Sequence, residues 1–226
     1  MAYIPTVWKN GEFPPIDAEH LNKIEQGIAN SAPGGYGLGG EAKLLTANDN
    51  LDDIWRAGWY AWDTAPQNAP IVGGTPISYC SMIVLNKGGD YMKTQVVFSS
   101  TGSELHRANN GLGWTPWEWV NPPMILGTEY RTTERYMGEP VYTQIINCGS
   151  MPDIGSSKGV SIAAFNVAVV TFISGWCSYY AAMFDETILG MAMSANAVNI
   201  VIKNLNREVN SSAVMYALVK YTKTTD

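Results

Sequence analysis

Hydrophobic and polar residues alternate in short runs through the part of the chain that follows residue 57. Runs of this kind cover residues 58–62, 81–85 and 91–98, and turns rich in Pro, Gly and Asn separate them. A last aromatic stretch places Trp117 and Trp119 two residues apart, so an extended backbone puts both rings on one face. Short strands at this spacing predict a small antiparallel β domain.

Longer apolar runs dominate the second half of the chain. A strand is predicted at residues 141–147, and longer β-rich runs at 160–173, 197–203 and 213–221, with Asn, Gly and Ser between them. This pattern predicts a C-terminal β-sandwich or jelly roll of about 100 residues. Helical patterns are scarce after residue 57, so the expected fold class is mainly β.

One short helix is predicted near the N-terminus, after an extended arm that contains several prolines. Asp17 is placed as the N-cap, and Leu21, Ile24 and Ile28 follow at i, i+3 and i+7 as one narrow apolar stripe. A helix of about 13 residues is marginal alone in water. The stripe therefore needs a partner, either the rest of the chain or the same helix in sister subunits. The second option predicts a short coiled-coil stem, such as that of a trimer.

A glycine-rich segment divides the helix from the β-rich part. We expect residues 1–33 to form an N-terminal arm and stem helix, 34–40 a flexible linker, 41–122 a β domain and 123–226 the C-terminal β-sandwich domain. Gly35, Gly37 and Gly40 formally match G-x-G-x-x-G. A dinucleotide site needs that motif between a strand and a helix, whereas here it follows a helix and a proline. The segment is interpreted as a linker.

Composition and charge exclude several classes of partner. Charged residues make up 15% of the chain, against about 25% in an average protein. A polar but uncharged surface is common where a chain packs against copies of itself. The net charge is −6 and no basic cluster occurs, which argues against nucleic acid and against an anionic membrane surface. No signal peptide or membrane span is recognisable, so no membrane insertion is expected.

Metal and cofactor chemistry are not expected either. Cys80, Cys148 and Cys177 are odd in number and widely spaced, so we interpret them as reduced structural cysteines rather than disulfides or metal ligands. The acidic cluster Asp49, Asp52 and Asp53 lacks the Gly and the terminal Glu of a calcium loop. Helix capping at a short turn over residues 50–55 explains it better.

Enzymatic chemistry has few candidate residues. His20 lies in the stem helix and His106 in a segment, 103–110, that is interpreted as a polar loop; neither has a Ser or Cys partner. A glycosidase needs two convergent carboxylates. The candidates in the second half are Glu129, Glu134, Glu139, Asp153, Asp185 and Glu186. Their convergence cannot be judged from spacing, so a small polysaccharide depolymerase stays an alternative.

Three segments resemble components of phage tails. The strings WKNG (8–11) and PIDAEHLNKIEQGI (15–28) resemble the N-terminal segment of tail and baseplate proteins. Residues 41–120 are similar to the knob domain of pyocin and phage fibres, through GWY (58–60), QVVF (95–98) and WTPWEW (114–119). The strings TEYRTTERY (128–136) and GEPVY (138–142) resemble the opening of a domain at the tip of tail fibres.

The resemblance implies a homotrimer that attaches to other tail or baseplate proteins through its N-terminal arm. It also implies recognition of a bacterial surface receptor, often a glycan. Such a protein belongs to the virion, in the phage tail, after synthesis in the host cytoplasm. The residues after Ser150 carry no part of the resemblance.

Aromatic and basic residues supply the candidate receptor contacts. Trp and Tyr stack on sugar rings and tolerate partial exposure, and Trp176, Tyr179 and Tyr180 lie between two predicted strands, where loops carry function. Arg131 and Arg135 form either an anionic-ligand patch or ion pairs with Glu129 and Glu134 on a solvated face. Trp114, Trp117 and Trp119 of the knob are further candidates for sugar contacts, but packing in the core of the knob is the favoured interpretation for them.

These observations together predict a non-enzymatic, oligomeric tail-fibre subunit that binds a bacterial receptor, expected to be a glycan. A stand-alone bacterial glycan-binding module, a small depolymerase and a baseplate or collar subunit without receptor contact remain the alternatives. A monomeric state favours the module, loss of polysaccharide favours the enzyme, and assembly with tail proteins without cell binding favours the baseplate subunit.

Overall fold

The structure, a computed structural model, describes residues 19, 21–24, 42–87, 92–177, 187–194, 197–204 and 214–224. It confirms the mainly β fold class, with 3₁₀ turns η1 and η2 between the strands. The elements in chain order are β1 (Lys43–Leu44), η1 (Leu51–Asp53), β2 (Gly58–Trp62), β3 (Ile71–Val72), β4 (Thr75–Pro76), β5 (Cys80–Asn86), β6 (Lys93–Ser99), β7 (Glu104–Asn109), β8 (Glu118–Trp119), β9 (Glu129–Tyr136), β10 (Glu139–Ser150), β11 (Ser157–Ser161), η2 (Ala163–Phe165), β12 (Val167–Cys177), β13 (Thr187–Ser194), β14 (Ala197–Asn204) and β15 (Val214–Lys223).

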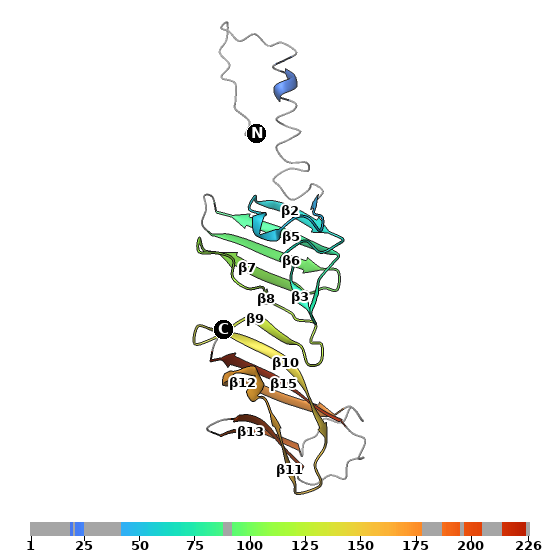
Figure 1. Cartoon of the computed structure of the whole chain (residues 1–226), viewed down its shortest axis with the longest axis vertical. Coiled ribbons are helices and arrows are strands. Elements are labelled where there is room, and N and C mark those ends of the chain that lie inside the picture. Colours follow the sequence, from blue (N-terminus) through green and yellow to red (C-terminus); the bar gives the residue numbers. More distant parts are fainter. Residues whose placement is uncertain are drawn as a thin grey trace.

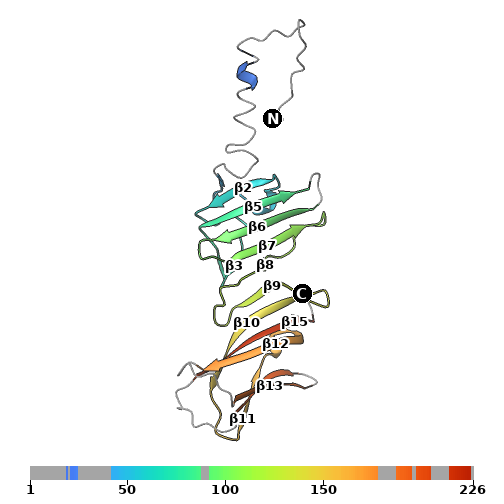
Figure 2. The ribbon, with the colours of Figure 1, turned by 180° about the vertical axis from the view of Figure 1, so that it is seen from behind.

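One sheet runs along the length of the β-rich part. Its strand order is β1-β2-β5-β6-β7-β8-β9-β10-β15-β12, so it follows the chain up to β10 and then returns through β15 and β12. The strands lie across the long axis of the molecule and succeed one another along it (Figures 1 and 2). The junction between the first and second halves is the parallel pairing of β8 with β9, with the single register pair Trp119 and Thr132.

The first half packs its core on one face of this sheet. The sheet side chains of this core come from β2, β5, β6 and β7, with Trp119 and Tyr130 beside them. Trp119 and Tyr130 meet edge to face, with ring centroids 5.3 Å apart. The other side of the core comes from η1 and from irregular segments, which contribute Leu51, Leu45 and Ala69.

The second half packs a second core between two sheets. The strands β11, β14 and β13 form a separate antiparallel sheet, and Ile200 and Ile202 of β14 are fully buried in the core. Tyr221 of β15 lies between two stacked rings, Tyr142 and Phe165, at centroid distances of 6.1 and 6.2 Å. Two facing layers agree with the sandwich predicted for this half.

The two cores lie on opposite faces of the continuous sheet. Laterally paired residues share a face, and successive residues alternate between faces. Tyr130 of the first core pairs with Thr143, which pairs with Lys220, outside the second core. The second core instead takes the adjacent pair, Tyr142 and Tyr221. The face that is buried in the first half is therefore the outer face in the second half.

Each half consequently leaves one apolar sheet face open. We call these the first open face, made by Trp59, Ile83, Leu85, Val96 and Phe98, and the second open face, made by Ile145, Phe172, Trp176, Tyr216 and Leu218. Leu85 and Phe98 are 56% and 37% exposed, and Phe172 and Trp176 are 47% and 41% exposed. The two open faces are on opposite sides of the sheet.

The strand predictions are confirmed where alternation is regular. β2, β5, β6 and β10 lie at the predicted positions, and β12, β14 and β15 match the longer runs in the second half. The capped turn predicted at residues 50–55 is present as η1, with Asn50 as its N-cap. The predicted linker at 34–40 and most of the N-terminal arm lie outside the described residues. The division at residue 122 stays a prediction, although Tyr130 packs in the first core.

Two interpretations were wrong. Residues 103–110 are not a polar loop, because strand β7 spans Glu104–Asn109 and buries Leu105 and Arg107. The acidic residues Asp49 and Asp52 do not cap η1, since Asn50 Oδ1 accepts from the Asp52 N–H at 3.0 Å. Asp49 instead accepts hydrogen bonds from Thr46, and Asp52 forms an ion pair with Arg107.

Candidate functional site

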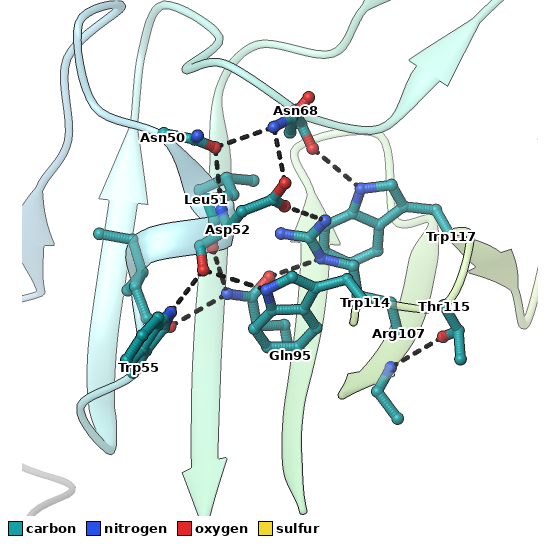
Figure 3. Close-up of polar contacts among 12 residues, drawn as sticks. Asn50, Leu51, Asp52, Trp55, Asn68, Gln95, Arg107, Trp114, Thr115 and Trp117 are labelled. Atoms are coloured by element: carbon teal, nitrogen blue, oxygen red, sulfur yellow. Dashed lines mark hydrogen bonds and ion pairs between the residues drawn. The ribbon is translucent and has the colours of Figure 1, made fainter. Parts of the chain in front are cut away.

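A groove opens beside the first core, where two tryptophans and an ion pair come together (Figure 3). Its volume is about 490 Å³, and we call it the tryptophan groove. Asp52 comes from η1, Arg107 from β7, and Trp114 and Trp117 from the segment between β7 and β8. The lining residues are Asp52, Asn68, Ala69, Ile71, Arg107, Trp114, Thr115, Pro116 and Trp117.

Arg107 organises the floor of the groove. Its side chain is 5% exposed, its Nη1 donates to Asp52 Oδ1 at 2.7 Å, and its Nε donates to Gln95 Oε1 at 2.8 Å. The guanidinium carbon lies 4.5 Å from the Trp114 ring centroid and 4.4 Å from that of Trp117. Burial lowers the pKa of Arg107, while the hydrogen bond and the charge of Asp52 raise it. The cation is thus neutralised and stacked rather than solvated.

Backbone groups hold both indole rings in place. Trp114 Nε1 donates to the Asp52 carbonyl and Trp117 Nε1 to the Asn68 carbonyl, each at 3.0 Å. Asn68 has a φ of 59°, a left-handed conformation that asparagine tolerates better than most residues. Its Nδ2 donates to Asn50 Oδ1 at 2.9 Å and to Asp52 Oδ2 at 2.8 Å. The rings and the amide are therefore fixed before any ligand arrives.

Gln95 connects the groove to the first core. It is fully buried in β6, and its Nε2 donates to the carbonyls of Leu51 at 2.7 Å and Ile54 at 3.1 Å. The Leu51 carbonyl also accepts from the Ile54 N–H at 3.3 Å, so Gln95 adds a side-chain donor at the end of this short turn. Because the amide oxygen of Gln95 accepts from Arg107, the position of η1 and the position of the guanidinium are coupled.

The predicted arginine patch is an ion-pair cluster around Glu118. Arg131 Nε donates to Glu118 Oε1 at 2.9 Å, and Arg135 Nη2 contacts Glu118 Oε2 at 2.7 Å. The predicted partners were wrong: Glu129 pairs with Lys223 and Glu134 with Lys220, both on β15. The arginines of β9 therefore reach Glu118 on the adjacent β8, whereas Glu129 and Glu134 reach lysines on β15, which lies beyond β10.

Of the predicted aromatic contacts, the structure places Trp176 on the second open face. It stacks on Tyr216, with ring centroids 6.0 Å apart, and is 41% exposed. Tyr179 and Tyr180 lie outside the described residues. Arg131 aligns, through Tyr142, with Tyr221 of β15, whereas Trp176 aligns with Tyr216 of the same strand. Tyr216 and Tyr221 are five residues apart. This offset is about 17 Å at the usual rise per residue, so the structure does not bring Trp176 and the arginines together.

The predicted stem is described only in part. Residues 19 and 21–24 are helical, Leu21 is 50% exposed and Ile24 is half-buried. Ile28 lies outside the described residues. An apolar side chain that stays exposed is compatible with a stem contact to another subunit, and the oligomer remains a prediction.

The groups considered for catalysis have structural neighbours. His106 Nε2 contacts Glu104 Oε1 at 2.7 Å. Burial raises the pKa of the Cys80 thiol to about 11 and also raises that of Cys148, which disfavours the reactive thiolates. His20 lies outside the described residues, and the Cys177 side chain is not described. In the parts of the chain that the structure describes, no group of three His, Cys, Asp or Glu side chains is placed to hold a metal, and no helix is long and apolar enough to cross a membrane.

The sequence interpretation favoured core packing over sugar contact for the tryptophans at 114, 117 and 119, and Trp114 is not among the residues of the first core. Trp119 is buried there, and Trp117 packs against the same core from its edge. Asp52, Asn68 and Arg107 were not recognised as members of one site. The available signal was the alternation of β7, which puts Arg107 on the buried face with Leu105 and so requires an acidic partner.

The sequence matches no protein-family model and no curated protein. Solved structures of pyocin fibres give distant matches. The R1 fibre of P. aeruginosa, residues 323–701, is 10% identical with a TM-score of 0.29, over 78% of this chain and 66% of that fragment. The R2 fibre of P. aeruginosa, residues 323–691, is 13% identical with a TM-score of 0.32, over 82% and 68%. An N-truncated R2-type tail fibre is 13% identical with a TM-score of 0.30, over 80% and 97%. These values do not establish a common fold.

Proposed function

We propose that this chain is an oligomeric adhesion subunit of a phage tail fibre or tail-like particle, which binds a receptor on the bacterial surface without catalysis. The receptor is a glycan, and the N-terminal arm attaches the subunit to other tail or baseplate proteins. The resemblance of residues 8–28, 41–120 and 128–142 to tail components introduced this function. The geometry of the long sheet supports it independently.

The observation that carries the proposal is the pair of open apolar faces. Large apolar side chains rarely form a continuous exposed patch on a monomeric soluble protein, and such a patch marks an interaction surface. Each covered half stands next to an uncovered half on the same side of the sheet. A second copy can therefore place its covered half over the open face of the first. Strands stacked along the long axis give such an assembly the extended form of a fibre.

The chain's low charge fits the same assembly. Removing charges from water is costly when subunits pack together, and charged residues make up 15% of the sequence. The first open face is lined by Trp59, Ile83 and Val96 in laterally adjacent positions, and His106 follows next in the row. This face is suited to burial against protein rather than to contact with an anionic surface.

The test is the absolute mass of the full chain by light scattering. A trimer of 24.6 kDa subunits has a mass of about 74 kDa by simple multiplication, 3 × 24.6. Phe98→Glu introduces a charge on the first open face and is expected to shift the protein to smaller species. Leu112→Glu, at a side chain that is 95% exposed in a turn, is the matched control and is expected to keep the assembly.

A monomer over a wide concentration range overturns the fibre assembly and leaves the stand-alone glycan-binding module. Binding of the labelled oligomer to bacterial cells tests the adhesion role, and an oligomer that binds no cells indicates a structural baseplate subunit. Loss of surface polysaccharide during the same incubation overturns the non-catalytic role and favours a depolymerase.

A further inference from the structure

The tryptophan groove has a floor whose charges are unequally accessible. Arg107 is 5% exposed at its side chain, whereas Asp52 is 38% exposed. The cation is enclosed between two indole rings, and a carboxylate edge faces the solvent. A ligand in the groove therefore meets the Asp52 carboxylate, which accepts hydrogen bonds. The negative charge of this carboxylate repels an anionic ligand, which would instead need a hydrogen-bond donor there.

The groove also offers apolar area held in one orientation. The indole N–H groups are already bonded to backbone carbonyls, so Trp114 and Trp117 have no unpaired donor that would favour rotation. Trp117 packs against the first core, while Trp114 lies in front of the guanidinium (Figure 3). Fixed rings lose little conformational entropy on binding, which favours affinity from a small contact.

Polar groups surround these rings on several sides. Each Asp52 oxygen accepts one bond within the protein, and a carboxylate oxygen accommodates a second. The two donor hydrogens of the Asn68 amide nitrogen serve Asn50 and Asp52, which turns the amide oxygen away from both. The Thr115 hydroxyl accepts from the Ala108 N–H, so its own hydrogen can be donated elsewhere. The groove thus combines acceptors, one hydroxyl donor and an aromatic surface.

We propose that the tryptophan groove binds an uncharged sugar residue of a bacterial surface glycan. The apolar C–H face of the sugar ring lies on Trp114, and its hydroxyls donate to the Asp52 carboxylate and the Asn68 amide oxygen. Arg107 is a positioning residue, since it fixes the carboxylate and both indole rings without reaching the sugar. The inference rests on the proposed function for the nature of the receptor, and it assigns the contact to a different region from Trp176.

The experiment uses the full chain and an array of bacterial glycans that includes neutral saccharides and acidic ones. The protein is expected to bind neutral members, and Trp114→Ala is expected to weaken that binding about 10-fold or more, the effect of about 1.4 kcal/mol of lost contact. Asp52→Asn keeps an oxygen for Arg107 and is expected to weaken binding by a smaller factor. Trp176→Ala tests the rival contact on the second open face. Leu112→Ala, at a side chain that is 95% exposed, is the control that is expected to leave affinity unchanged.

Thermal unfolding of each variant separates loss of binding from loss of folding. Trp114→Phe retains an aromatic face without the indole N–H, and it is expected to recover part of the affinity. Selective binding of acidic glycans, or binding lost with Trp176→Ala and retained with Trp114→Ala, overturns the inference.

Whole-cell binding, measured in parallel, distinguishes this inference from the proposed function. Cell binding that Trp114→Ala leaves intact overturns the groove assignment and preserves the adhesion role. Absence of cell binding by the assembled wild-type protein overturns both.

Discussion

The two halves of the long sheet bury their cores in different ways. In the first half, the core contains Lys93, Gln95 and Arg107, all nearly inaccessible to solvent, among its apolar side chains. In the second half, the core lies between two sheets and consists mainly of apolar and tyrosine side chains, with Gln144 as a buried polar neighbour. Both halves use the same sheet, so the difference lies in what covers it.

A covering sheet satisfies its own backbone groups, whereas an irregular cover does not. The second half is covered by β11, β14 and β13, whose peptide groups pair with one another. The first half is covered by η1, the short β3–β4 hairpin and irregular segments, and side chains donate hydrogen bonds to the carbonyls of Leu51, Ile54 and Asn68. Buried backbone groups need partners, and the polar side chains in the first core supply them.

The polar core therefore has a second consequence, which is the tryptophan groove. Arg107 lies buried in the first half, where it donates hydrogen bonds to Gln95 and Asp52, and the two tryptophans stack on its guanidinium. A site with fixed aromatic rings thus accompanies a cover in which only β3 and β4 form a small sheet and the rest is irregular. The second half also buries polar side chains, such as Gln144, whose Nε2 donates to the Gly127 carbonyl at 3.0 Å, but no arginine is buried among its described residues.

The largest expected effect is the loss of stability from truncating a core side chain, and it tests whether the two cores unfold separately. Met82→Ala in the first core and Ile200→Ala in the second each remove a fully buried side chain, and each is expected to cost about 2–5 kcal/mol of unfolding free energy. Native-state hydrogen exchange is expected to show faster exchange mainly in the half that carries the change, because β8 and β9 share a single register pair. Leu112→Ala, at an exposed turn position, is the control. Equal acceleration in both halves would show that the long sheet unfolds as one unit.

The next effect concerns the polar first core. Arg107→Leu leaves the buried Gln95 oxygen without its donor, which is expected to cost about 1–3 kcal/mol. Asp52 is partly exposed, so water can replace the lost arginine donor and the unpaired carboxylate adds little to the loss of unfolding free energy. The matched change Arg135→Leu affects an arginine that is 41% exposed in its pair with Glu118, and is expected to cost about 1 kcal/mol or less. Chemical denaturation measures both values, and equal costs would contradict the structural role of the buried arginine.

Sequence reasoning recovered the elements whose pattern is local. β2, β5 and β6 follow from a local pattern, because residues on one face are more buried than those on the other. β10 was found as an apolar run, although residues 141–144 are buried on both faces. η1 was found through the cluster of polar residues that starts at Asn50. Neither inference needs information about distant segments.

The site was missed because its residues are far apart in the sequence. Asp52 and Arg107 are separated by 55 positions, and Asn68 and Trp117 by 49. An arginine in a polar stretch is ordinarily a surface residue, so the segment around Arg107 was interpreted as a loop. Which face of a strand is buried depends on what covers it, and the reversal of the buried face between the halves has no local signature.

The smallest expected effect compares one buried tyrosine from each half at alkaline pH. Burial and the carboxylate of Glu129, to which its hydroxyl donates, raise the pKa of Tyr221. The unfolded chain ionises its tyrosine near pH 10, so this stabilisation is complete below that pH and is lost as the pH rises toward the folded pKa. Between pH 10 and 11 the wild type is expected to lose about 1 kcal/mol relative to Tyr221→Phe.

Tyr60 in the first half provides the comparison. Its pKa is raised by burial, but the positive charge of Arg56 opposes the shift, and its hydroxyl donates to the Arg56 carbonyl rather than to a carboxylate. Tyr60→Phe is therefore expected to flatten the alkaline stability curve less than Tyr221→Phe does. Urea denaturation across this pH range gives both curves. A larger effect of Tyr60→Phe than of Tyr221→Phe would mean that burial raises a tyrosine pKa more than the Glu129 carboxylate does. It would also mean that the first core excludes water more completely than its polar side chains imply.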